Sequence, residues 1–262
     1  KTVNIVVFPL FCAMLKAHIP LFEQKREKRV MKISDFIAVG FILLYACAVF
    51  FFPLNISPDG SLVWGSLSDG FSNFGHVTKA HPYLMGFFKV GLLATFGEML
   101  KVRRKTGSWK VPALPARFIV WGITGMVFSY VFAMFATGVG ALMGSPVWPV
   151  GSIDRTTWSA TLIFAVSTSF WQNMIFAYPM MLGHEWCNEV INKKRFVGGE
   201  EFLASVDKHI WGSFIPKTIL YFWIPAHTVT FCLPQDYRVL MSAVLSLALG
   251  FILTFRPKAA KK

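Results

Sequence analysis

The chain has 262 residues, of which 55% are hydrophobic, 16% aromatic and only 15% charged. Soluble proteins carry roughly 25% charged residues, so this composition excludes an ordinary soluble domain and indicates a membrane protein. The formal net charge of +13 would suit a nucleic-acid-binding protein. We expect no nucleic-acid partner, however, because the sequence lacks the interleaved aromatic and basic residues of nucleic-acid recognition.

The first 33 residues form an apolar and basic segment. Its apolar stretch, VNIVVFPLFCAML, is shorter than the roughly 20 residues that an unaided membrane-spanning helix needs. Pro9, Lys16, His18 and Pro20 interrupt its continuation. The pattern fits a signal-like anchor, an interfacial helix or part of an upstream element equally.

Six later stretches are long and apolar enough to cross a membrane, which predicts an all-α, polytopic helical membrane bundle of about six spans. They cover residues 34–53, 81–100, 117–140, 159–182, 211–233 and 237–255. We therefore divide the chain into an N-terminal segment (1–33), an additional span with a charge-poor loop (34–80), a helical membrane domain (81–255) and a basic tail (256–262).

Basic and charge-poor connections alternate along the chain. Most of the 26 lysines and arginines lie in four blocks, 23–33, 101–117, 183–217 and 256–262. Basic loops remain on the side of the membrane where the protein is made. The pattern thus predicts that both basic ends of the chain face the cytosol or a matrix-like compartment.

Two connections carry further structural signals. Residues 54–79 are rich in Gly, Ser, Asn and Asp and contain Lys79 as their single basic residue, which predicts an ordered loop or short interfacial helix. The polar stretch before the fifth span predicts an amphipathic helix at residues 199–208.

Two stretches combine prolines, aromatic residues and a Gly-acid pair around predicted spans. In AHPYLMGFFKVGLLATFGEML, residues 80–100, these residues are His81, Pro82, Gly97 and Glu98. In YFWIPAHTVTFCLPQDYRVL, residues 221–240, they are Trp223, Pro225, Phe231, Pro234, Tyr237 and Arg238. Together with the apolar spans between them, these stretches resemble the Mpv-seventeen family, also called the peroxisomal membrane protein twenty-two family.

The resemblance covers about two thirds of the chain and implies a divergent member with an extra N-terminal region. In this sequence Pro225 lies one place after the usual Trp-Pro position, and Glu98 replaces the usual Asp. The resemblance implies a non-enzymatic, multi-pass protein that forms a pore or assists small-solute passage. It also implies a mitochondrial inner or peroxisomal membrane in a eukaryote, or the plasma membrane in a bacterium.

Five polar residues inside the predicted spans are candidates for a polar interior. They are Lys89, Asn173, Lys217, His227 and Thr230. An ionisable group facing hydrocarbon costs about 2.5–3.5 kcal/mol on insertion scales, so such groups usually face a bundle interior or water. We predict that the five line one pore, in which Lys89 favours anions. Alternatively, the two lysines extend to an interface and Asn173 only bonds between helices.

Pro216 and Pro225 predict that the fifth span is kinked and internal, because each proline removes a backbone donor that lipid cannot replace. No metal is expected: GHEWCN begins like a zinc-protease helix, but Asn188 replaces the second histidine. The four cysteines are singly placed, so their spacing predicts neither a disulfide scaffold nor a structural metal site.

No catalytic motif is visible, so we expect no enzymatic activity and no cofactor. The predicted function is channel-like passage of small solutes or ions. Membrane lipids and those solutes are the expected partners, with a homo-oligomer or other membrane-complex subunits as further candidates. The alternative function is that of a structural subunit in a larger membrane complex.

Overall fold

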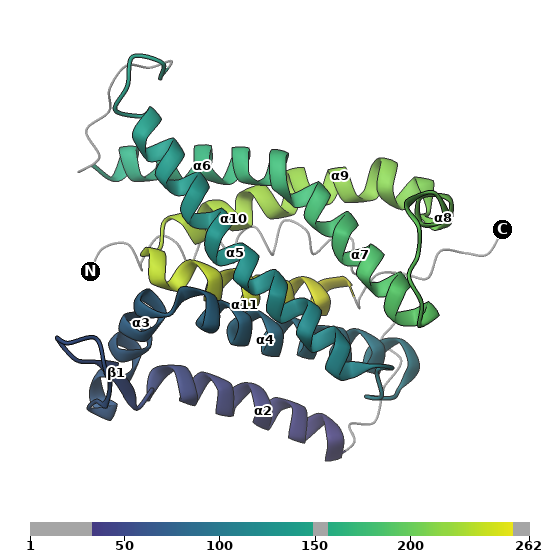
Figure 1. Ribbon diagram of the computed structural model, residues 1–262, viewed down its shortest axis with the longest axis horizontal. Helices are drawn as coiled ribbons and strands as arrows, with labels where there is room; N and C mark the ends of the chain where they lie inside the picture. Colours follow the sequence, from purple (N-terminus) through teal and green to yellow (C-terminus); the bar gives the residue numbers. More distant parts are fainter. Residues whose placement is uncertain (1–32, 149–156, 254–262) are drawn as a thin grey trace.

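The computed structural model of the chain describes residues 33–148 and 157–253 (Figure 1). Within them the fold is helical except for one short hairpin, which confirms the predicted all-α bundle. The long helices are α2 (Ile33–Phe50), α4 (Pro82–Thr106), α5 (Leu114–Leu142), α6 (Trp158–Gln172), α7 (Tyr178–Lys193) and α11 (Gln235–Leu253). The short ones are α3 (Gly70–Ala80), α8 (Gly199–Ser205), α9 (Ile215–Thr218) and α10 (Ile224–Phe231). The N-terminal segment before Ile33 and the basic tail lie outside the described residues.

Among the described residues, four helices are long and apolar enough to cross a membrane, so the chain is a membrane-embedded protein. They are Ile33–Phe50, Pro82–Arg103, Leu114–Leu142 and Trp158–Lys193. The two remaining predicted spans are also helical. One is the run of short helical pieces from Ile210 to Phe231, and the other is α11, described as far as Leu253.

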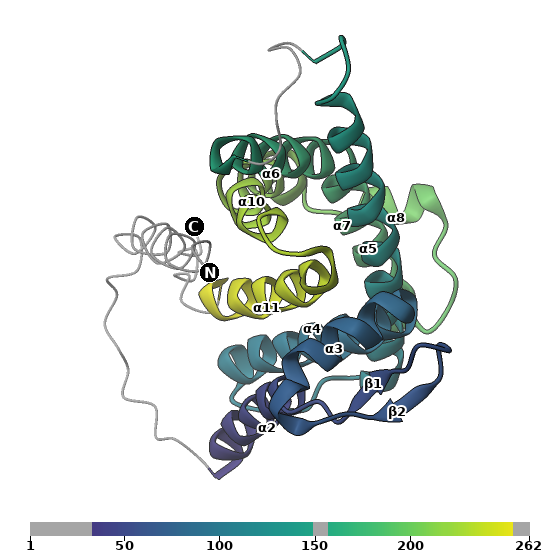
Figure 2. The same cartoon turned by 90° about the vertical axis from the view of Figure 1, so that its left-hand side faces the viewer.

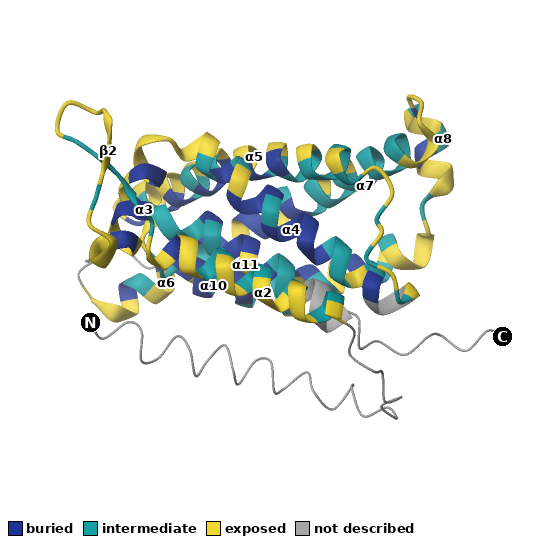
Figure 3. Cartoon of the chain, turned by 90° about the horizontal axis from the view of Figure 1, so that it is seen from below, coloured by how far each residue is buried: buried dark blue, intermediate teal, exposed yellow. Residues whose placement is uncertain are grey.

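Helix α4 lies at the centre of the bundle, where it packs most extensively against α5 and α11. Helix α10 packs on α6, which together form a second layer beyond α11 (Figure 2). Glycines allow α4 and α5 to approach closely, because a Cβ on Gly125 would overlap the carbonyl of Gly86. Buried residues concentrate in α4, α5 and α11, whereas α2 is the outermost helix and is largely exposed (Figure 3).

The two kinds of connection gather at opposite ends of the bundle. The start of α4, the end of α5 and the α10–α11 connection lie at the charge-poor end, on the left of Figure 1. The α4–α5 connection, the end of α7 and α8 lie at the other, basic end. Alternation of basic and charge-poor connections along the chain predicts this separation in an antiparallel bundle.

The charge-poor connection at residues 54–79 is more ordered than a loop. It forms an antiparallel hairpin of β1 (Leu54–Ile56) and β2 (Leu62–Trp64), followed by α3. At the hairpin turn, the Asp59 carboxylate accepts hydrogen bonds from Ser57 and Ser61, and these bonds lower its pKa to about 2. The predicted helix at residues 199–208 is present but shorter, as α8.

Three π-helical turns widen the helices just before prolines. They are Asn173–Ala177, Ile210–Phe214 and Ile219–Trp223, each followed two residues later by Pro179, Pro216 or Pro225. A proline lacks the backbone N–H and its ring crowds the carbonyl four residues earlier, so a wider turn relieves that contact. The predicted irregularity of the fifth span therefore takes the form of two π turns.

Candidate functional site

A cavity of about 600 Å³ lies inside the bundle, between α4, α5, α7, α11 and the helical run from Ile210 to Phe231. It reaches from the basic end to the middle of the bundle, since its walls include Glu189 near the end of α7 and Asn173 at the start of the same continuous helix. Polar side chains line it at both depths: Glu98, Lys101, Gln172, Asn173, His184, Glu185, Asn188, Glu189, Ser205, Asp207, Thr218, His227, Ser242 and Ser246.

A hydrogen-bonded pair forms the inner end of the cavity. Asn173 is fully buried and His227 is 5% exposed. The Asn173 amide nitrogen lies 2.8 Å from the Ser169 carbonyl oxygen and 3.0 Å from Oε1 of Gln172. The Asn173 Oδ1 lies 3.2 Å from Nδ1 of His227. The π turn that begins at Asn173 contributes one of these two side chains to the cavity.

Both polar atoms of the Asn173 amide lie within hydrogen-bond distance of His227 Nδ1, the nitrogen at 3.0 Å and the oxygen at 3.2 Å. Which of them makes the bond depends on which imidazole nitrogen carries the proton. Nε2 of His227 is buried and has no hydrogen-bond partner among the described residues, and neither has the indole nitrogen of Trp223. Both side chains contribute to the cavity lining.

Phenylalanines close the cavity beyond His227. The ring of Phe132 lies edge-on to the imidazole, with 5.4 Å between centroids, and is itself 5.4 Å from the ring of Phe231. Phe128 packs on Phe132 at 5.5 Å. All three phenylalanines are buried. In this conformation the polar cavity is thus open toward the basic end and sealed toward the charge-poor end.

Arg117 ties together the helices at the mouth of the cavity. Its guanidinium donates hydrogen bonds to Asn188 at 2.8 Å and to Asn192 at 2.7 Å, and lies 3.5 Å from the Glu98 carboxylate. These contacts join α5, α7 and α4 at the basic end. Asn188 in turn donates to Glu185 at 3.2 Å. At the mouth, charged and amide side chains are therefore linked by hydrogen bonds from α4 through α5 to α7.

The cavity lining carries more negative than positive charge, although the chain as a whole is basic. It contains the carboxylates of Glu98, Glu185, Glu189 and Asp207 and the single ammonium of Lys101. Glu98 and Glu189 are close to cations, at 3.5 Å from Arg117 and 3.2 Å from Lys193. The remaining carboxylates give the mouth an acidic character.

The prediction that five polar residues share one interior is wrong for three of them. Lys89 is buried elsewhere, between α3, α4 and the start of α11. Its ammonium donates to the Thr78 hydroxyl at 2.5 Å and to the Asp236 carbonyl at 3.3 Å, and lies over the Phe74 ring. Lys89 is therefore bound within this junction and does not line the cavity.

Lys217 and Thr230 are the other two corrections. Lys217, the residue after Pro216, is exposed. The next residue, Thr218, lines the cavity. Thr230 is fully buried, and its hydroxyl donates to the Ala226 carbonyl one turn earlier. That bond satisfies the hydroxyl within its own helix.

Several lining residues were not among the sequence candidates. Gln172, His184, Trp121, Ser242 and Ser246 line the cavity but were not predicted to do so. One signal was present in the sequence: Asn173, His184 and Asn188 share one helical face of α7 and its preceding turn. It was hidden because the predicted span ended at residue 182, whereas α7 continues to Lys193.

The residues behind the family resemblance mostly hold elements together. His81 and Pro82 form the α3–α4 junction, and buried Gly97 lies against α11. Pro234 separates α10 from α11. Tyr237 stacks on Phe71 and donates to its carbonyl at 2.9 Å, which fixes α11 to α3. Arg238 donates to the Leu233 carbonyl and lies over the ring of Phe231.

Within residues 33–148 and 157–253, no group of three or more His, Cys, Asp and Glu side chains is placed to hold a metal ion. Comparisons with models of known protein families, with curated proteins and with solved structures found no match.

Proposed function

We propose that this membrane protein passes small solutes or ions through its interior, with a preference for cations. The observation that carries the proposal is the polar cavity inside the bundle, which ends at the buried pair of Asn173 and His227. In a membrane, polar groups are expensive unless they meet one another or water. The polar side chains gathered around this one space therefore favour a hydrated interior over simple helix packing.

The depth of the cavity supports a path rather than a surface hollow. Its α7 wall runs along continuous helix from Asn173 to Glu189, which at 1.5 Å per residue is roughly 24 Å. The hydrocarbon core of a bilayer is about 30 Å thick. A cavity open at the basic end thus leaves only the phenylalanine layer around Phe132 to be opened.

The chemistry of the lining supports cations as the preferred solutes. The carboxylates of Glu185 and Asp207 raise the local concentration of cations at the mouth. At the inner end, the ring of Trp223, whose centroid lies 5.2 Å from that of His227, offers a cation–π surface.

The proposal is tested by conductance of the purified protein in planar bilayers under a KCl gradient. We expect a conductance whose reversal potential shows cation preference. Phe132→Ala removes one ring from the phenylalanine layer and should raise the conductance several-fold. The sign of the reversal potential should not change. Phe170→Ala is the matched control, because Phe170 is exposed on the outer face of α6; it should behave like the unaltered chain.

Absence of conductance from both the unaltered chain and Phe132→Ala would overturn the proposal, provided both variants elute as folded protein. Obligatory co-purification with other subunits would instead favour the structural-subunit alternative. Membership of the Mpv-seventeen family, the lack of enzymatic activity and the location in a particular organelle remain predictions.

A further inference from the structure

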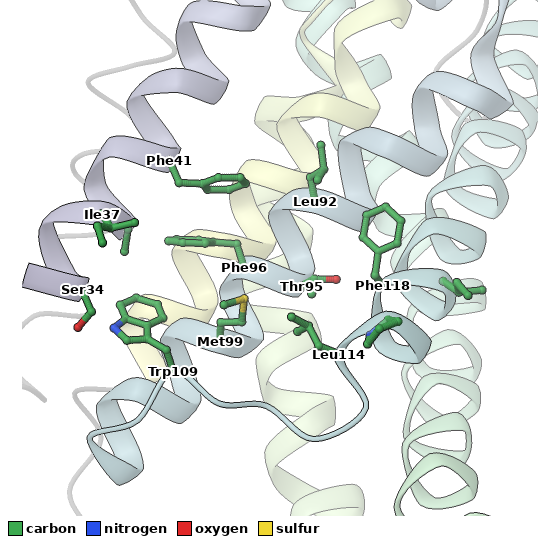
Figure 4. A pocket seen from close by; sticks show the side chains of 13 residues that line it. Ser34, Ile37, Phe41, Leu92, Thr95, Phe96, Met99, Trp109, Leu114 and Phe118 are labelled. Carbon is green, nitrogen blue, oxygen red and sulfur yellow. The ribbon is translucent and has the colours of Figure 1, made fainter.

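A second space, separate from the polar cavity, lies between α2, α4 and α5. It measures about 680 Å³ and is open on one side (Figure 4). Its walls are Ser34, Ile37, Ala38, Phe41, Leu92, Thr95, Phe96, Met99, Trp109, Leu114, Pro115, Phe118 and Ile119. Almost all of these side chains are apolar, and we call this space the α2 crevice.

Helix α2 is attached to the bundle at a few points, and the crevice lies beside them. Near its start, Asp35 accepts two hydrogen bonds of 2.7 Å from the Arg103 guanidinium of α4. At its end, Phe50 stacks on Phe71 at 5.4 Å. Between them, Phe41 stacks on Phe96 at 5.1 Å and forms the upper limit of the crevice in Figure 4. The helix is otherwise mostly exposed, with Val49 as its buried residue.

The α2 crevice is suited neither to ordered water molecules nor to being empty. An ordered water molecule needs two to four polar partners, and the crevice offers the hydroxyls of Ser34 and Thr95 and the indole nitrogen of Trp109 across its whole volume. An empty space of this size would forfeit the packing contacts of every wall residue. An apolar occupant is therefore required, and in a membrane the crevice opens toward hydrocarbon chains.

We propose that the α2 crevice binds an acyl chain of a membrane phospholipid whose headgroup lies at the basic end. The crevice is formed by the first turns of α2 and α5 and the last half of α4, all of which belong to that end. Its long walls of aliphatic and aromatic carbon match a hydrocarbon chain. The exposed Lys110, next to Trp109 of the crevice wall, attracts an anionic headgroup.

Trp109 lies in the crevice wall at the basic end. Its ring packs near Phe96, with 6.0 Å between centroids. Tryptophan favours the membrane interface, where its ring meets acyl chains. This position is consistent with a headgroup at the basic end.

The test is lipid retention by the purified full-length chain, measured by native mass spectrometry. Ala38→Trp fills the crevice from α2, and Ile119→Trp fills it from α5. Each has a matched control outside the crevice: Ala48→Trp on an exposed position of α2, and Ile123→Trp, whose residue is 52% exposed against 50% for Ile119. We expect the unaltered chain and both controls to retain a phospholipid, and both crevice variants to retain at least five-fold less.

A second measurement uses the delipidated proteins. Added phosphatidylglycerol should raise the melting temperature of the unaltered chain and the controls, and should leave the crevice variants unchanged. The proposal is overturned if the unaltered chain retains no lipid and does not respond to phosphatidylglycerol, or if a folded Ile119→Trp chain retains and responds as its control does. The first result would indicate that a protein segment, and not a lipid, fills the crevice. Conductance through the polar cavity does not enter this test.

Discussion

At the scale of single residues, hydrogen-bond partners decide where each polar group of this chain lies. Lys89 and Lys217 are both lysines inside apolar stretches, yet Lys89 is 2% exposed and Lys217 is exposed. The difference is that Lys89 meets the Thr78 hydroxyl and the Asp236 carbonyl. Asp236 is 147 residues away along the chain, so no local pattern announces that contact.

Glu201 in α8 is the centre of an exposed ion-pair cluster. It accepts hydrogen bonds from Arg195 at 2.6 Å and from Lys193 at 3.1 Å, which lower its pKa to about 2. Its unfolded pKa is about 4.3, so the cluster stabilises the α7–α8 connection fully above that value. That contribution is lost as the pH falls from about 4.3 toward 2.

We therefore predict that the Glu201 carboxyl titrates near pH 2 in the folded chain. Carbon NMR of labelled glutamate in detergent micelles measures this midpoint, and Glu201→Gln assigns the signal. Arg195→Gln should move the midpoint up toward the ordinary value, because it removes the principal hydrogen-bond donor. A midpoint near 4.3 in the unaltered chain would contradict the prediction.

At the scale of elements, the effect of a proline is local and can be predicted from the sequence. The packing of one helix against another cannot. Pro179, Pro216 and Pro225 each follow a π turn because the chemistry of proline acts within one turn of its own helix. Helix α2 is apolar all round, which predicts a membrane span but leaves its partner open. Its attachment to α4 depends on the Asp35–Arg103 pair, 68 residues apart.

We predict that Asp35→Asn lowers the melting temperature in detergent more than the double variant Asp35→Asn with Arg103→Gln. The single change leaves the guanidinium of Arg103, a largely buried residue, without its carboxylate. An uncompensated buried charge costs more than the loss of both partners. Differential scanning fluorimetry measures the difference, with a shift of several degrees expected between the two variants. Equal melting temperatures would show that the pair does not hold α2.

At the scale of the whole molecule, the basic connections lie at one end of the bundle and the charge-poor hairpin at the other. If the basic end stays on the side of synthesis, the hairpin crosses to the far side. The cavity then opens toward the side of synthesis, because its mouth lies between α4, α7 and α8. The α2 crevice likewise lies in that half of the bilayer.

Cysteine labelling in bacterial cells that express the chain tests this orientation. In a background without the four native cysteines, Ser61→Cys in the hairpin should react with a membrane-impermeant maleimide in intact cells. Lys110→Cys at the basic end should react only after permeabilisation. Both positions are exposed, so accessibility within the fold does not limit the reaction. Reversed labelling, or labelling of both from outside, would contradict the predicted orientation.

The sequence by itself determined the membrane class, six helical stretches, the alternation of basic and charge-poor connections and the irregularity at Pro216 and Pro225. These features depend on hydropathy, charge and proline chemistry, which act within a helix or between a helix and its solvent. Among the predicted lining residues, Asn173 and His227 do line one cavity.

Only the tertiary structure decided which polar groups meet. It placed Lys89 against Thr78, turned Lys217 outward, satisfied Thr230 within its helix, and brought Glu98 to Arg117. It also joined His184, Ser242 and Asn173 around one space. The physical reason is that a helix presents a polar group to whichever helix packs beside it. In a bundle that neighbour depends on the packing of all the others.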